Sequence, residues 1–216
     1  MRLTWYGQNC FKIQTKAKRG EKEVTIVTDI FDKKIGLRPP QGQIDIVTLS
    51  HYTYYHTGPP ALKSQPFIID AAGEYSLRGI HLEGIESFSD KEQGAQRGRN
   101  TIFLMESEGI RLCHLGELGH DLTEDQLEAI GEVDILLVPV GNPNLLSLKD
   151  VKSIIGKLEP GIIIPMQYQI KNLKSDLTDC REFCQALGGA KKEDKLNIKS
   201  KEVKEMENNV VVLNPA

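Results

Sequence analysis

The sequence lacks long apolar runs, a secretory start and an excess of charge of either sign. No window approaches the ~18 consecutive apolar residues that a membrane-spanning helix needs. The first residues, MRLTWYGQNCFKIQ, contain no apolar core of the kind that a signal peptide carries. The formal net charge is -3, which favours neither nucleic acid nor an anionic membrane surface as a partner. We therefore expect a soluble protein that works in the cytoplasm.

Cysteine is also scarce. The spacing of the four cysteines is not that of a disulfide framework, and CREFC has three residues between its cysteines where a redox motif has two. The four are Cys10, Cys113, Cys180 and Cys184; we interpret the last two, four residues apart on a predicted helix, as buried apolar residues, and we expect a reducing compartment. The 216 residues are 39% apolar and 26% charged, which predicts one globular domain over 1–216.

The first half of the chain alternates short apolar runs with turn residues, which is typical of strands. We predict strands at 3–7, 10–15, 23–29, 44–50, 66–70, 80–85, 101–107 and 110–116. Glu108-Gly109 between the last two predicts a tight hairpin.

Helices join the strands in the second half. Thr123 and Gln126 form a capping-box pattern, and Gly131 ends the short helix that they begin. Further helices are predicted at 147–160 and 176–187, and further strands at 133–141, 161–166 and 208–215. Two facing sheets with helices outside would bury all these apolar faces.

Polar side chains follow four of the predicted strands. His51 and His56 come after 44–50, Ser89 and Asp90 after 80–85, Glu117 and His120 after 110–116, and Gln167 after 161–166. Loops at one edge of a sheet are common places for a site, because rigid strands aim their side chains.

At these residues the chain resembles the metallo-β-lactamase fold, in particular the small bacterial metal-dependent hydrolases of the ascorbate-6-phosphate-lactonase-like branch. The matching stretches include WYGQNCF (5–11), VTDIFD (27–32), LSHYTYYHTG (49–58), RGRNTIFLMESEGIRLCHLGELGHDLT (97–123) and IIIPMQY (162–168). The resemblance implies an α/β (α+β) fold, a four-layer αββα sandwich, with a metal site at one edge of the paired sheets. It also implies two metal ions that activate a bridging hydroxide.

The resemblance assigns ligand positions residue by residue. The family pattern is His-x-His-x-Asp-His, then a His before an Asp, an Asp in a Leu-Gly-Asp turn, and a His in Pro-Met-His-Tyr. His51 and His56 match, and Glu117 replaces the Asp of the turn. The remaining ligand positions carry Thr53, Tyr55, Ser89 and Gln167, and the branch's early His is Gln8. We place Gln8, Asp90 and His120 in the surroundings of the site.

These replacements lead to three hypotheses. Hydroxyl and amide groups are poor zinc ligands, so the first is a hydrolase homologue without a cofactor that keeps a binding or scaffold role. The alternative is a hydrolase of a small ester, lactone or phosphoester with one divalent ion, Zn or Mn, on His51, His56 and Glu117. The third is a structural or interaction role, for which a homo-oligomer is one candidate assembly. The partner is an unknown small molecule or protein, and whether Arg97 and Arg99 face a substrate anion or solvent stays open.

Overall fold

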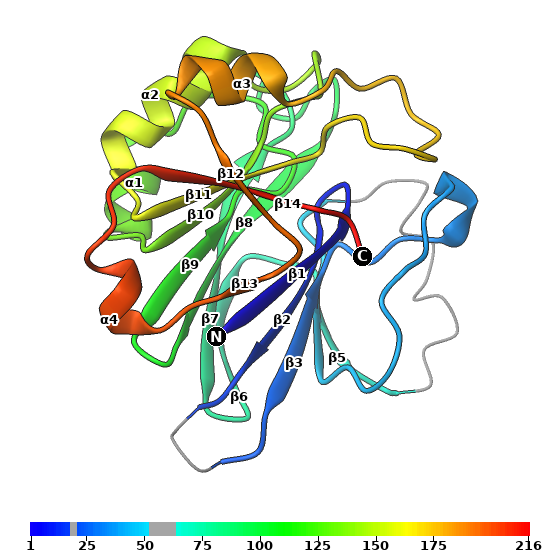
Figure 1. Ribbon diagram of the computed structural model, residues 1–216, viewed down its shortest axis with the longest axis vertical. Coiled ribbons are helices and arrows are strands. Elements are labelled where there is room, and N and C mark those ends of the chain that lie inside the picture. Colours follow the sequence, from blue (N-terminus) through cyan, green and yellow to red (C-terminus); the bar gives the residue numbers. More distant parts are fainter. Residues whose placement is uncertain (18–20, 52–63) are drawn as a thin grey trace.

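The computed structural model describes residues 1–17, 21–51 and 64–216 and contains two mixed β-sheets (Figure 1). The first sheet has the strand order β13-β1-β2-β3-β4-β5. Its strands are β1 (Arg2–Gly7), β2 (Cys10–Thr15), β3 (Val24–Thr28), β4 (Ile46–Thr48), β5 (Phe67–Ile69) and β13 (Leu196–Asn197). β1, β2 and β3 pair antiparallel, whereas β3, β4 and β5 pair parallel.

The second sheet has the order β12-β14-β11-β10-β9-β8-β7-β6. Its strands are β6 (Gly73–Leu77), β7 (Ile80–Phe88), β8 (Arg99–Ser107), β9 (Ile110–His114), β10 (Ile135–Pro139), β11 (Ile162–Met166), β12 (Lys191–Glu193) and β14 (Asn209–Leu213). β6 to β9 form an antiparallel meander, and β9, β10, β11, β14 and β12 pair parallel. The parallel strands β10 and β11 are buried along their whole length, as expected for strands that are covered on both faces.

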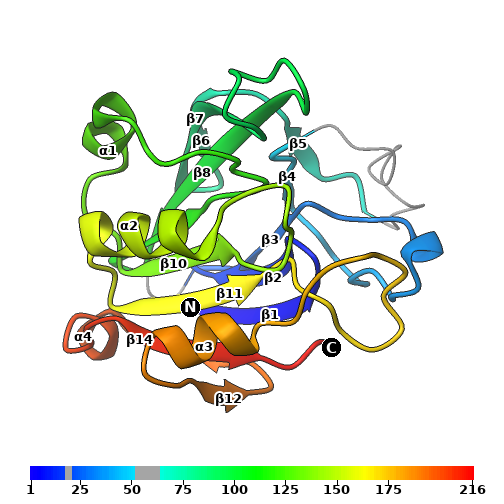
Figure 2. The ribbon, with the colours of Figure 1, turned by 90° about the horizontal axis from the view of Figure 1, so that it is seen from above.

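Helices cover the outer face of the second sheet (Figure 2). They are α1 (Glu124–Ile130), α2 (Leu148–Leu158) and α3 (Arg181–Ala186), and a short α4 (Ser200–Val203) precedes β14. Adjacent residues of β10 point to opposite faces of the second sheet. Leu137 packs between the sheets with Trp5 and Phe103, whereas Leu136 packs on the helix side with Ile154 of α2. The main core therefore lies between the two sheets.

The outer face of the first sheet has a different cover in the described part of the chain. Val27 of β3 and Val47 of β4 pack there against Phe31, Ile35 and Leu173. Ile35 belongs to a 3-10 helix, η1 (Lys33–Ile35), which begins at Asp32 and ends at Gly36. This layer consists of η1 and extended loops instead of long helices, and the loops bring residues 170–177 beside residues 29–37.

Most predicted elements are confirmed, with boundary shifts of a few residues. Glu108 and Gly109 both have positive φ, 55° and 69°, as a two-residue hairpin turn requires. The capping box of Thr123 and Gln126 is present, and Ser147 caps α2 in the same way with Asp150. The structure adds β6 and β12, whose polar sequences form strands because they pair with β7 and β14.

The third predicted helix is shorter than expected, Arg181–Ala186 in place of 176–187. The main-chain N–H of Thr178 donates to Gly141 O at 2.8 Å, and Thr178 O accepts from Gln169 N at 2.8 Å. These bonds commit residues before 180 to the loops that follow β10 and β11, so they are not available for a helix.

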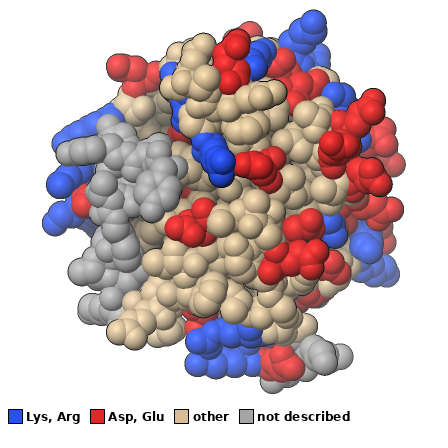
Figure 3. All heavy atoms as spheres, turned by 180° about the vertical axis from the view of Figure 1, so that it is seen from behind, with Lys and Arg blue, Asp and Glu red and all other residues tan. Residues whose placement is uncertain are grey.

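Acidic and basic side chains lie interspersed on the face shown in Figure 3, in keeping with the small net charge. Among the described residues, no helix is long and apolar enough to cross a membrane.

Candidate functional site

A cavity of about 240 Å³ opens at the edge of the two sheets where several strands end. Its polar lining comes from loops that follow β1, β3, β4, β7, β9, β10 and β11, so strands from both sheets deliver side chains to one place. The lining residues are Gln8, Asn9, Asp29, Phe31, Ile35, His51, Arg97, Glu117, Asn142, Gln167, Ser175 and Leu177.

His51 is held from one side by a hydrogen-bonded chain that begins at Asp29. The Asp29 carboxylate accepts the Ser50 main-chain N–H at 2.7 Å and the Ser50 hydroxyl at 2.6 Å. Because that hydroxyl donates to Asp29, its oxygen accepts from Nδ1 of His51, which lies 2.7 Å away. Nε2 of His51 therefore points in the other direction, toward Glu117.

Glu117 joins His51 to Gln167. Oε1 of Glu117 lies 3.3 Å from Nε2 of His51 and accepts the side-chain amide of Gln167 at 2.5 Å. The Glu117 main chain is fixed as well, because its N–H donates to Oδ1 of Asn100 at 2.8 Å. A half-buried carboxylate needs a donor, and here the amide of Gln167 supplies it.

Strained backbone marks the same cavity. Gln8, Asp29 and Gln167 have φ values of 50°, 40° and 52°, in the left-handed region that side chains other than glycine rarely adopt. The Gln167 main chain is held there by its N–H, which donates to Gln8 O at 3.1 Å, while Gln8 O also accepts from the Trp5 indole at 2.9 Å. Such strain gathers at functional sites, where the surrounding structure enforces it.

Fully buried His114 lies beneath this network. Its Nε2 is 3.0 Å from Asn9 O and 3.8 Å from the Asp29 carboxylate. Burial lowers the pKa of His114, and the neighbouring Asp29 carboxylate only partly opposes that effect. His114 is therefore neutral and donates its Nε2–H to the Asn9 carbonyl, in line with its position inside a predicted strand.

Asp90 organises the loop that leads to β8. Its two carboxylate oxygens accept the main-chain N–H groups of Glu92 and Gly94 and those of Gln96 and Arg97, at 2.6–3.0 Å. Desolvation raises the pKa of Asp90, but the backbone donors outweigh it and hold the pKa below its usual value. Asp90 thereby fixes the main chain of Arg97, which lines the cavity.

Two other predicted positions lie away from the cavity lining. Ser89 is buried, and its hydroxyl has no hydrogen-bond partner among the described residues. The ring of His120 is held by the main chain, because Phe88 N donates to its Nε2 at 3.2 Å and its Nδ1 lies 2.7 Å from Asp121 O. Thr53, Tyr55 and His56 lie outside the described residues.

Several residues of the site were not assigned from the sequence. Asp29 and Ser50 orient His51, and Asn100 orients Glu117. Asp29 follows a buried strand, as the assigned residues do, so the signal was present. Ser50 and Asn100 sit inside stretches that are typical of strands, and only the folded chain shows their contacts.

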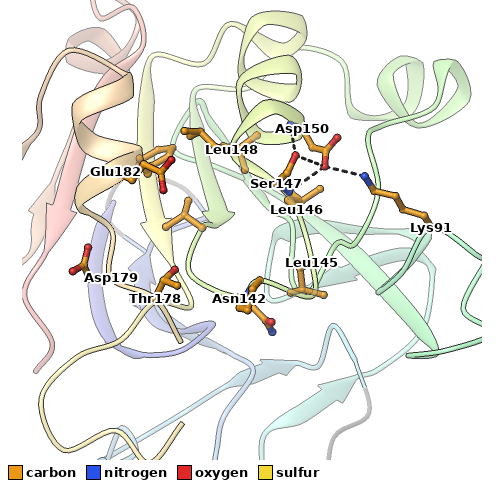
Figure 4. A pocket seen from close by; sticks show the side chains of 14 residues that line it. Lys91, Asn142, Leu145, Leu146, Ser147, Leu148, Asp150, Thr178, Asp179 and Glu182 are labelled. Atoms are coloured by element: carbon orange, nitrogen blue, oxygen red, sulfur yellow. Dashed lines mark hydrogen bonds and ion pairs between the residues drawn. The ribbon is translucent and has the colours of Figure 1, made fainter. Parts of the chain in front are cut away.

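A second cavity of about 670 Å³ lies beside the first, under the start of α2 (Figure 4). Two of its three carboxylates have partners. Asp150 accepts from Ser147 and from Lys91, whose Nζ is 3.1 Å away, and Asp179 pairs with Arg181 at 2.6 Å. We therefore place the candidate site in the smaller cavity, where the buried polar groups converge.

Comparison with known proteins identifies the family to which this chain belongs. Residues 2–167 match the β-lactamase superfamily domain. The chain belongs to this superfamily. A solved structure from Thermotoga maritima, assigned to the Zn-dependent hydrolases of the metallo-β-lactamase superfamily, is 35% identical, with a TM-score of 0.78 over 98% of this chain and 97% of that one. The expected fold is therefore confirmed.

Curated relatives in this superfamily are more distant. A UPF0173 protein from Pyrococcus abyssi is 26% identical over 184 residues, which cover 78% of this chain and 83% of the relative. A UPF0173 metal-dependent hydrolase from Lysinibacillus sphaericus is 25% identical over 202 residues, which cover 78% and 85%. The chain is thus a member of a family of metal-dependent hydrolases with the metallo-β-lactamase fold.

The donor set of the cavity can be compared with what a two-metal centre needs. The described residues bring one imidazole, His51, and one partly exposed carboxylate, Glu117, to the same point. Gln167 donates an N–H to the Glu117 oxygen that a cation would use. If the Gln167 amide were reversed, its own oxygen would face that carboxylate oxygen, and neither could donate. No group of three or more His, Cys, Asp or Glu in the described ranges is arranged to hold a metal ion. The described residues do not fit a pair of divalent ions.

Proposed function

We propose that this chain is a metallo-β-lactamase-fold protein that binds a ligand in its strand-edge cavity without a two-metal centre. The observation that carries the proposal is the contact of Gln167 Nε2 with Glu117 Oε1 at 2.5 Å, beside His51 at 3.3 Å. A neutral amide occupies the position that faces the carboxylate, so a hydrogen bond satisfies Glu117 in place of a cation.

The cavity supports a binding role. Its lining is mainly polar, with apolar side chains from Phe31, Ile35 and Leu177, so it offers many hydrogen-bonding groups to a small molecule. His51 and Glu117 are each fixed by neighbours, so the wall of the cavity is preorganised. A purely structural role does not require a polar cavity whose lining residues have strained main-chain conformations.

Metal analysis of tag-free protein tests the proposal. We expect substoichiometric zinc, manganese and iron by elemental mass spectrometry, and a melting temperature that zinc and manganese leave unchanged, because a tightly bound ion stabilises the folded state. His51→Ala and His81→Ala serve as a matched pair. His81 is an exposed histidine of β7 that does not line the cavity. One or more equivalents of metal, lost in His51→Ala but kept in His81→Ala, overturn the proposal.

The convergence of His51 and Glu117 favours one alternative, a single-metal hydrolase completed by His56. That function requires hydrolysis of a small ester, lactone or phosphoester that rises with added Zn²⁺ or Mn²⁺ and disappears in Glu117→Gln. An activity with these two properties, together with stoichiometric metal, replaces the first proposal.

A further inference from the structure

The cavity has two buried oxygen atoms that lack donors. Oδ1 of Asn9 and Oε1 of Gln167 accept no hydrogen bond from any described residue. Asn9 is 2% exposed and Gln167 is 3% exposed, and both line the cavity. Buried carbonyl oxygens are normally satisfied, so two in one cavity require an explanation.

The surrounding chain directs its donors elsewhere. The Thr28 hydroxyl and Nε2 of His114 both donate to the main-chain oxygen of Asn9, not to its side chain. The amide N–H of Gln167 is used on Glu117, which fixes its oxygen on the opposite side. Because the partly exposed Glu117 carboxylate adds acceptor oxygens to the same lining, we expect the inner wall to bind a ligand that supplies hydrogen-bond donors.

Arg97 stands on the exposed side of the same cavity. It also lines a neighbouring cavity of about 340 Å³, which shares His51 with the first. Arg97 has no ion-pair partner among the described residues, whereas Arg99 pairs with Glu86 at 3.5 Å on the surface. Asp90 fixes the main chain of Arg97 through an N–H donated at 2.6 Å. The main chain of Arg97 is thus fixed at the cavity, and its exposed guanidinium can pair with an anion.

We propose that the cavity binds a small molecule with an anionic group at one end and hydrogen-bond donors, hydroxyl or ammonium, at the other. The anionic group pairs with Arg97, and the donors satisfy Asn9 and Gln167. The volume of about 240 Å³ favours a compact molecule. This inference rests on the proposed function, because it assigns the ligand chemistry of the metal-free cavity.

Four probes, titrated by calorimetry into chelator-treated protein, test the inference. D-gluconate combines a carboxylate with hydroxyl donors, and 4-aminobutyrate combines a carboxylate with an ammonium group. Sorbitol has the donors without the charge, and hexanoate has the charge without the donors. We expect gluconate or 4-aminobutyrate to bind at least about tenfold more tightly than sorbitol and hexanoate, and the one that binds identifies the donor type. Failure of both, or equal binding of hexanoate, overturns the inference.

Variants then locate the binding. Arg97→Gln should weaken the bound probe about tenfold or more, while Arg99→Gln, a matched arginine two residues away, should leave it unchanged. Asn9→Ala should weaken it as well, and because Arg97 is exposed, Arg97→Gln keeps the test valid if Asn9→Ala fails to fold. An affinity that Arg97→Gln does not alter contradicts the inference. Metal content decides the proposed function separately, so failure of one is distinguishable from failure of the other.

Discussion

The contact between Gln167 and Glu117 makes a quantitative prediction for Gln167→Glu. The substitution keeps the size of the side chain but places a second carboxylate against Oε1 of Glu117, where the amide now donates at 2.5 Å. Two charges at ~3 Å repel by about 5 kcal/mol at an effective dielectric constant of about 20. The folded protein can avoid this repulsion by protonating one carboxyl group, which sets an upper limit on the loss.

The upper limit on the stability that Gln167→Glu loses depends on pH. For an ordinary glutamate with a pKa of about 4.3, protonation costs about 1.4 kcal/mol per pH unit, or about 3.7 kcal/mol at pH 7 and about 1 kcal/mol at pH 5. The repulsion raises the pKa of the pair in the folded state, so the destabilisation is greatest at high pH and fades as the pH falls toward the unfolded value. We expect Gln167→Glu to lose about 3 kcal/mol at pH 7 and at most about 1 kcal/mol at pH 5, because the partial exposure of Glu117 screens some of the repulsion.

Urea unfolding followed by circular dichroism, in metal-free buffer at both pH values, measures these losses. Gln167→Met is the matched control, because it removes the amide without adding a charge and should show a difference from the native protein that does not change with pH. Added Zn²⁺ or Mn²⁺ should restore stability to Gln167→Glu, since two carboxylates beside His51 attract a cation. If Gln167→Glu is as stable as the native protein at pH 7 without metal, the two side chains are not in contact and the reasoning is wrong.

Three further predictions concern the surroundings of the site. His114 is buried and neutral with a lowered pKa, so the unfolded state takes up its proton first as the pH falls below about 6.5. The free energy of unfolding should therefore drop with a slope of up to about 1.4 kcal/mol per pH unit that His114→Gln removes, and an unchanged slope would falsify this assignment. Asp90→Asn loses acceptors for the N–H groups of Gln96 and Arg97, so limited trypsin digestion should cleave after Arg97 faster than in the native protein, and equal rates contradict the role of Asp90. Ile154→Ala removes a fully buried side chain from the inner face of α2 and should lower the free energy of unfolding in urea by about 2–5 kcal/mol, without changing probe binding. A loss below about 1 kcal/mol would show that the helix layer is not packed as described.

Local signals in the sequence were sufficient for most of the secondary structure. Thr123 and Gln126 predict their helix because an N-terminal cap depends only on residues three positions apart. The continuous apolar run of β10 predicts a strand covered on both faces, and the structure buries it between the core that separates the two sheets and the helices. β6 could not be predicted in this way, because its polar residues gain their strand conformation only by pairing with β7.

The sequence by itself also determined the family and the chemical identity of the polar residues at the strand ends. The positions of His51, Glu117 and Gln167 in their motifs predicted that they belong to one site, and the structure places the three in contact. Only the tertiary structure brings exposed Arg97 to the lining of the cavity, in a loop whose main-chain N–H groups, that of Arg97 included, donate to Asp90, a contact that no sequence pattern records.

The tertiary structure also decided how Glu117 is satisfied. A sequence shows that an amide stands where the family has an imidazole, but not that its N–H is turned toward the carboxylate and its oxygen left without a donor. Hydrogen bonds depend on distances and angles between residues that lie 50 positions apart along the chain. Only the packing of the two sheets fixes those distances, and they determine which hydrogen-bonding atoms the wall of the cavity presents.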